Sequence, residues 1–179
     1  MVYSTYCAPK QNMMNVKHTI FKSLAGLILL AVMPVAGNAD NHERVIEACT
    51  NLVLDYAYFR DRPDAEGVAN LFTENAQLTV LGQTFVGRQA IADRIRDSAD
   101  GPIFRHMMST IRIFPDNGSH AHGVSYVSVY TAPAGQFPRP FVQPAAVGEY
   151  HDRFVLTESG WKIARREFVA VFVAEAPKD

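Results

Sequence analysis

The chain has 179 residues and a formal net charge of −1, and 48% of its residues are hydrophobic. It carries no basic stripe and no interleaving of basic with aromatic residues, so the sequence excludes a nucleic-acid-binding protein. The only two cysteines are Cys7 and Cys49, and Cys7 lies in a segment that is predicted below to be cleaved. Cys49 would then have no partner in the chain, so the fold is expected to rest on an apolar core and not on disulfide bonds.

Residues 1–39 have the pattern of an export signal. Lys17 and Lys22 supply positive charge, residues 24–33 form an apolar run, and small residues precede position 40. The apolar run is about half of the roughly 20 residues that cross a bilayer. We therefore expect an exported protein, periplasmic or secreted, with no stable membrane insertion after cleavage. A retained membrane anchor is the alternative.

Residues 40–179 are predicted to form one domain, with 14 basic and 18 acidic residues and a net charge of −4. A helix is predicted over residues 42–60, because apolar side chains recur there every three or four residues. These side chains are Val45, Ile46, Cys49, Leu52, Val53, Tyr56 and Phe59. On this stripe, Cys49 is expected to be a small buried apolar residue.

The later elements follow from apolar alternation and turn residues. A second short helix is predicted after Pro63, and a third over residues 87–96. Strands are predicted at residues 76–81, 84–86, 103–114, 120–130, 147–156 and 161–173. The proline-bearing segment 132–146 is predicted to be a loop or broken edge. The pattern indicates an α+β fold, in which a curved antiparallel sheet is covered on its concave side by three helices.

Three residues are candidates for acid–base chemistry. His106 lies among apolar residues of a predicted strand, and an imidazole titrates near neutral pH. Asp61 follows the first helix, where its carboxylate can orient the imidazole and make it a general base. Tyr56, on the stripe of the same helix, can steady an oxyanion through its hydroxyl. The alternatives are a core histidine, a surface aspartate and a core tyrosine.

Four further residues are predicted to bind the substrate: Phe104, Met108, Tyr126 and Arg166. Phe104 and Met108 alternate with His106, so they are expected on its face of the strand, together with Thr110 and Phe114. Tyr126 shares a strand face with Val124, Ser128 and Tyr130 and is expected to line the same cavity as His106.

Arg166 alternates with apolar residues and is expected to point inward, as is Asp152. Because isolated buried charges are very costly, the two are expected to pair. A purely structural ion pair is the alternative. His120 and His122 have a spacing that can chelate a metal, with His151 as a further ligand, but no complete ligand set is evident. We therefore predict neither a metal nor an organic cofactor.

Several segments resemble the SnoaL-like group of the NTF2-like superfamily. They are LDYAYFRD (54–61), LFTENA (71–76), GRQAI (87–91), RHMMS (105–109), GEYHD (148–152) and GWKIARR (160–166). The resemblance covers the whole of residues 40–179 and implies a cone-shaped α+β barrel. It also implies self-association, because NTF2-like sheets often pair, so a homo-oligomer such as a dimer is expected.

Within that superfamily, the arrangement of Tyr56, Asp61 and His106 is similar to that of scytalone dehydratase and the bile-acid 7α-dehydratases. The resemblance implies a cofactor-independent lyase, a dehydratase, or an isomerase that acts on a small hydrophobic carbonyl compound. His106 is the implied base and then acid, oriented by Asp61, while Tyr56 steadies the enolate oxygen. Two alternatives remain: a non-catalytic protein that binds a small ligand, and a structural small subunit of a dioxygenase-like complex.

Overall fold

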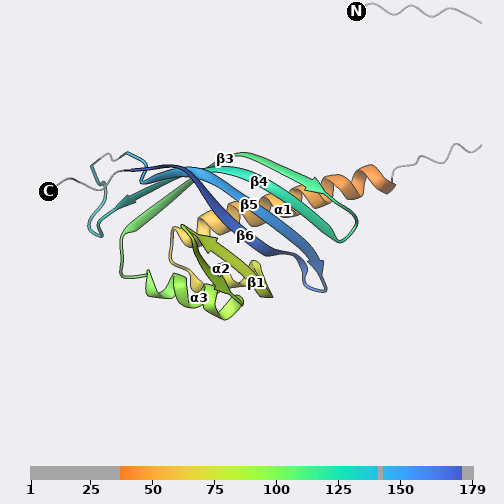
Figure 1. Ribbon diagram of the computed structural model, residues 1–179, viewed down its shortest axis with the longest axis horizontal. Helices are drawn as coiled ribbons and strands as arrows, with labels where there is room; N and C mark the ends of the chain where they lie inside the picture. The colour runs from red at the N-terminus through yellow and green to blue at the C-terminus, as the bar shows by residue number, and fades with distance from the viewer. Residues whose placement is uncertain (1–36, 141–142, 175–179) are drawn as a thin grey trace, which may run out of the picture. The chain divides into compact units, whose positions relative to one another are not determined.

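The computed structural model describes residues 37–140 and 143–174, which contain three helices and six strands (Figure 1). The helices are α1 (Gly37–Arg60), α2 (Ala65–Asn70) and α3 (Arg88–Asp97). The strands are β1 (Phe72–Val80), β2 (Gln83–Val86), β3 (Ile103–Pro115), β4 (His120–Ala132), β5 (Ala146–Thr157) and β6 (Gly160–Val173). The predicted α+β class is confirmed, and the order of predicted helices and strands matches the observed order.

The six strands form one curved sheet with the order β2-β1-β6-β5-β4-β3. All neighbouring pairs are antiparallel except β1 and β6, which run parallel, so the expectation of an antiparallel sheet is wrong for this one pair. Whether β6 runs parallel or antiparallel to β1 depends on the position and direction in which the chain enters β3 after α3. Local sequence patterns do not encode that long-range choice.

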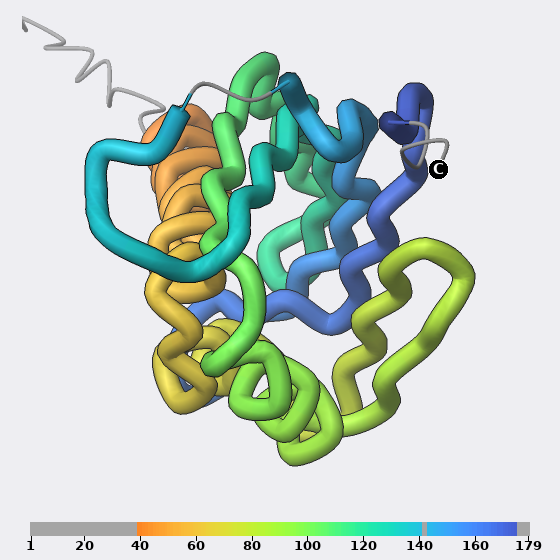
Figure 2. The backbone as a smooth tube through the Cα atoms, turned by 90° about the vertical axis from the view of Figure 1, so that its left-hand side faces the viewer, coloured from red at the N-terminus to blue at the C-terminus, as the bar shows by residue number. Residues whose placement is uncertain are grey.

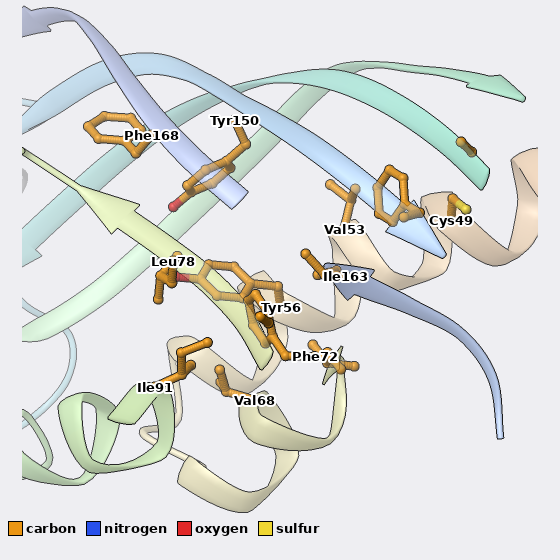
Figure 3. Close-up of a cluster of buried hydrophobic side chains, with 14 of the residues drawn as sticks. Cys49, Val53, Tyr56, Val68, Phe72, Leu78, Ile91, Tyr150, Ile163 and Phe168 are labelled. Atoms are coloured by element: carbon orange, nitrogen blue, oxygen red, sulfur yellow. The ribbon is translucent and has the colours of Figure 1, made fainter. Parts of the chain in front are cut away.

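The concave side of the sheet packs against α1, and the apolar stripe of that helix enters the core (Figures 1 and 2). Val45, Cys49, Val53 and Tyr56 are all buried, as the periodicity predicts. Figure 3 shows Cys49, Val53 and Tyr56 among side chains from the sheet and from the two short helices. The result is a single apolar cluster that fixes the position of the C-terminal end of α1.

Cys49 is completely buried, and burial raises the pKa of its thiol to about 12, with Asp152 adding to the effect. Only the thiolate reacts with thiol reagents. In a Cys7→Ser protein, we expect the native thiol to resist a disulfide reagent at pH 8 and to react fully after unfolding in denaturant. Rapid labelling of the native protein would contradict the buried position.

A β-bulge interrupts β3 between Ser109 and Arg112, where Thr110 has a φ of +48°. Since a bulge adds one unpaired residue, it reverses which side chains face inward. Thr110 and Phe114 are therefore exposed, and Ile113 is buried in their place. The prediction that these two residues share the face of His106 is wrong for this reason.

The predicted export signal lies almost entirely outside the described residues, and it stays a prediction. Helix α1 begins at Gly37, five residues before the predicted start of the first helix. Among the described residues, no helix is long and apolar enough to span a membrane.

Candidate active site

Asp61 and His106 form a close pair at the point where α1 ends beside β3. The Nδ1 atom of His106 lies 2.6 Å from Oδ1 of Asp61, and the two side chains are 7% and 10% exposed. The backbone N–H of His106 also donates to both carboxylate oxygens, at 3.2 and 3.0 Å. The predicted contact between these residues is confirmed.

This contact determines which imidazole nitrogen is available for chemistry. An ionised carboxylate can only accept hydrogen bonds, so a neutral His106 carries its proton on Nδ1. The lone pair then lies on Nε2. The backbone hydrogen bonds keep the carboxylate in place, so the orientation of the ring does not depend on one contact alone.

His106 lines a partly open cavity of about 210 Å³ between α1, α3 and the concave side of the sheet. Most of the wall is apolar, and the polar residues in it are Tyr56, Arg60, Arg94, His106, Thr131 and Tyr150. Phe104, predicted to bind substrate, is part of the wall. A cavity that is mainly apolar with a few converging polar groups is the usual form of a small-molecule site.

Two buried tyrosines, Tyr56 and Tyr150, line this cavity. The rings of Tyr56 and Tyr150 are 5.6 Å apart at an angle of 73°, and Figure 3 shows their hydroxyl ends pointing to the same side of the cluster. Tyr56 also lies edge-on to His106, with ring centroids 6.4 Å apart. Burial, with Tyr56 nearby, raises the pKa of Tyr150 well above its ordinary value although Arg166 opposes the shift, so its hydroxyl stays a proton donor.

Behind the tyrosines lies a buried ion pair between Arg166 and Asp152. The Nε and Nη2 atoms of Arg166 donate to the two carboxylate oxygens of Asp152, each at 2.7 Å. The guanidinium lies 4.3 Å from the ring centre of Tyr56 and 4.5 Å from that of Tyr150. The predicted pairing is confirmed, but Arg166 does not line the cavity and supports the tyrosines instead of contacting a ligand there.

Two other predicted substrate-binding residues lie outside the cavity. Tyr126 is 46% exposed, because its neighbour Val127 occupies the inward position of β4. The alternation of that strand is therefore opposite to the one predicted. Met108 lies on the inner face of β3, but it packs against the core beyond the cavity wall.

Four polar residues of the cavity were missed by sequence reasoning: Arg60, Arg94, Thr131 and Tyr150. Arg60 follows Tyr56 by four residues and so shares its helix face, which is a usable signal. Tyr150 alternates with Asp152 on β5, and that strand face was already expected to point inward. Arg94 lies between the buried Ile91 and Ile95 on α3 and had no comparable signal.

The histidines considered for a metal site have other partners. Nδ1 of His122 lies 2.6 Å from Asp116, Nε2 of His151 lies 2.8 Å from Glu149, and the ring of His120 contacts Ser119. Within residues 37–140 and 143–174, no group of three or more His, Cys, Asp or Glu side chains could hold a metal ion.

Comparison with known proteins agrees with this architecture. The family model for the SnoaL-like domain matches residues 44–167. No curated protein matches the chain. An NTF2-like protein of cystatin-like fold from Novosphingobium aromaticivorans is 26% identical, with a TM-score of 0.61 over 78% of this chain and 92% of that one.

Two further solved structures are similar in fold. A proposed scytalone dehydratase from Novosphingobium aromaticivorans is 22% identical, with a TM-score of 0.67 over 79% of this chain and 93% of that one. The hexachlorocyclohexane dehydrochlorinase LinA-type3 from Novosphingobium barchaimii is 14% identical, with a TM-score of 0.63 over 76% and 92%. The family match covers well over half of the residues, so this chain belongs to the SnoaL-like domain family and has the NTF2-like fold.

Proposed function

We propose that the protein is a cofactor-independent lyase or isomerase that removes a proton beside the carbonyl group of a small hydrophobic compound. The observation that carries the proposal is the contact of 2.6 Å between Asp61 and His106 at the wall of the cavity. A carboxylate that orients a nearly buried imidazole is the arrangement expected of a general base. Two proteins of the same fold are named as a dehydratase and a dehydrochlorinase, both eliminating enzymes, which agrees with this chemistry.

In the proposed reaction, Nε2 of His106 takes a proton from the carbon next to the carbonyl. The electron pair of the broken C–H bond moves into the carbonyl group and forms an enolate. The hydroxyls of Tyr56 and Tyr150 donate hydrogen bonds to the enolate oxygen, where negative charge develops. The carboxylate of Asp61 stabilises the imidazolium that results.

The imidazolium then returns its proton in one of two ways. In a dehydratase it protonates a β-hydroxyl group, which leaves as water while the enolate collapses to a conjugated carbonyl. In an isomerase the substrate also carries a β,γ double bond, so the enolate is a dienolate; the imidazolium protonates its γ-carbon, and the double bond moves into conjugation with the carbonyl. The same residues serve both outcomes, and the substrate determines which one occurs.

The test is deuterium exchange in D2O without any added cofactor. A panel of cyclic ketones and their β-hydroxy derivatives is incubated with the protein, and deuterium beside the carbonyl is measured by NMR or mass spectrometry. We expect enzyme-dependent exchange, with elimination of water from the β-hydroxy derivatives that fit. Retention of a panel compound in native mass spectrometry without exchange would instead support the non-catalytic binding protein and overturn the proposal.

A further inference from the structure

Arg60 is a buried cation that has no counter-ion among the described residues. The residue is only 4% exposed, and its guanidinium carbon lies 4.2 Å from the ring centre of Phe104. Its Nη1 atom is buried and has no hydrogen-bond partner, and no described residue accepts a hydrogen bond or forms an ion pair with Arg60. Burial lowers the pKa of Arg60, but a guanidinium stays protonated in proteins. An uncompensated buried charge is costly and calls for a partner.

The two described carboxylates that are buried or nearly buried do not supply that partner. Asp61 is next to Arg60 in the chain, but its carboxylate is occupied by the ring and the backbone N–H of His106. The other buried carboxylate, that of Asp152, is held by Arg166 in a bidentate pair. Both local carboxylates are therefore used, and none of the residues that line the cavity is acidic.

Arg94 brings a second guanidinium to the same cavity. It is half-buried on α3, lies 5.2 Å from the ring centre of Phe85, and is close enough to lower the pKa of Arg60. It forms no ion pair with a described residue. On the same helix, Arg88 pairs with Glu74, and Arg96 pairs with Asp93 and Glu66. The arginine of α3 that lines the cavity is thus the one without an acidic partner in residues 37–140 and 143–174.

We propose that the cavity binds small apolar compounds that carry one carboxylate group, with Arg60 as the main ligand of the carboxylate and Arg94 beside it. Guanidinium groups match the two oxygens of a carboxylate and bind them with charge-assisted hydrogen bonds. A cavity of about 150 Å³ holds benzene, so one of about 210 Å³ suits a single substituted ring. That the bound compound is also the substrate rests on the proposed function. In that case the carbonyl compound on which the protein acts also carries a carboxylate group.

The placement of Arg60 explains how such an anchor serves the reaction. Tyr56 and Arg60 are four residues apart on α1, so their side chains lie on one face of the helix. His106 is held by the residue that directly follows Arg60. A carboxylate bound at Arg60 therefore holds the rest of the ligand against Tyr56 and His106. Arg60 is a binding residue in this scheme, and the proton transfer itself belongs to His106.

The test compares two probes of equal size, cinnamate and its neutral amide, cinnamamide, by isothermal titration calorimetry. We expect cinnamate to bind roughly ten- to a hundredfold more tightly, the range for hydrogen bonds to charged groups. In Arg60→Met this preference should fall to about twofold or less, with cinnamamide binding unchanged. Arg165→Met is the control, because Arg165 is exposed and paired with Glu167, and it should keep the full preference.

Thermal unfolding separates a ligand-binding role of Arg60 from a structural one. Removal of an unpaired buried charge should leave the melting temperature of Arg60→Met unchanged or raised, whereas a structural role predicts a clear decrease. Equal binding of the two probes, binding of neither, or a preference kept in Arg60→Met overturns the proposal. His106→Asn should keep the preference for cinnamate. The binding test can therefore succeed or fail independently of the proposed catalytic function.

Discussion

Replacement of His106 by Asn is expected to slow proton abstraction by about 10²- to 10⁴-fold, which is the usual contribution of general acid–base catalysis. Asn has a similar size and can fill the same position, but it cannot accept a proton at neutral pH. The rate of deuterium exchange measures the effect directly. The folded state should be preserved, since His106 lies at the cavity wall and contributes little to the apolar core.

Asp61→Asn should reduce the rate by a comparable factor, for a different reason. The Asp61 carboxylate accepts from both Nδ1 and the backbone N–H of His106, and the Asn amide group has only one acceptor oxygen to replace two. The imidazolium formed in the reaction also loses its negative neighbour. We expect kcat to fall while KM changes little, because Asp61 is not among the residues that line the cavity.

The chain contains a matched control for this experiment. Asp116 lies 2.6 Å from Nδ1 of His122, the same contact as in the Asp61–His106 pair, but both side chains are about 40% exposed and lie outside the cavity. Asp116→Asn should leave the exchange rate unchanged. An equal loss in both aspartate variants, or full activity in His106→Asn, is incompatible with His106 as the base.

The contact between Asp61 and His106 could be predicted because most of its determinants are local. The apolar stripe on α1 determines which face of the helix carries Tyr56. Asp61 directly follows the last residue of α1, and β3 begins three residues before His106. Only one long-range assumption was needed, that β3 passes the end of α1. The structure confirms it by the contact at 2.6 Å.

The errors have equally specific causes. Tyr126 was assigned to the inner face because alternation shows that side chains point to two opposite faces but does not show which face is buried. Val127 takes the inner position through the pairing of β4 with its neighbours. The bulge in β3 depends on tertiary pairing in the same way. Arg60 went unnoticed because an arginine at a helix end is normally solvated. Its burial becomes evident only in the folded chain, where the ring of Phe104 on β3 lies against its guanidinium.

The buried ion pair leads to the largest expected change in stability. Arg166→Met leaves the Asp152 carboxylate, which is 1% exposed, without its only described partner. Loss of one member of a buried pair typically costs about 3–5 kcal/mol, because the remaining charge is neither solvated nor paired. A domain of this kind has only about 5–15 kcal/mol of total stability. Denaturant unfolding should therefore show a much lower midpoint.

Two controls distinguish an unpaired charge from a simple loss of packing. Arg165→Met removes the neighbouring arginine, whose pair with Glu167 is on the surface, and should change the free energy of unfolding by less than about 1 kcal/mol. The double variant Asp152→Leu with Arg166→Met removes both charges and should recover most of the lost stability. If the double variant is as unstable as the single one, the penalty comes from packing and not from the bare carboxylate.

The double variant also separates stability from function. Arg166 lies against the rings of both Tyr56 and Tyr150, and a methionine in its place keeps apolar contact but no longer attracts the ring faces. We expect the refolded double variant to exchange deuterium more slowly than the native protein, although its cavity wall is chemically unchanged. Full activity in that variant would mean that the ion pair serves the fold alone. Reduced activity at restored stability would mean that the charge of Arg166 orients the two hydroxyls for the enolate.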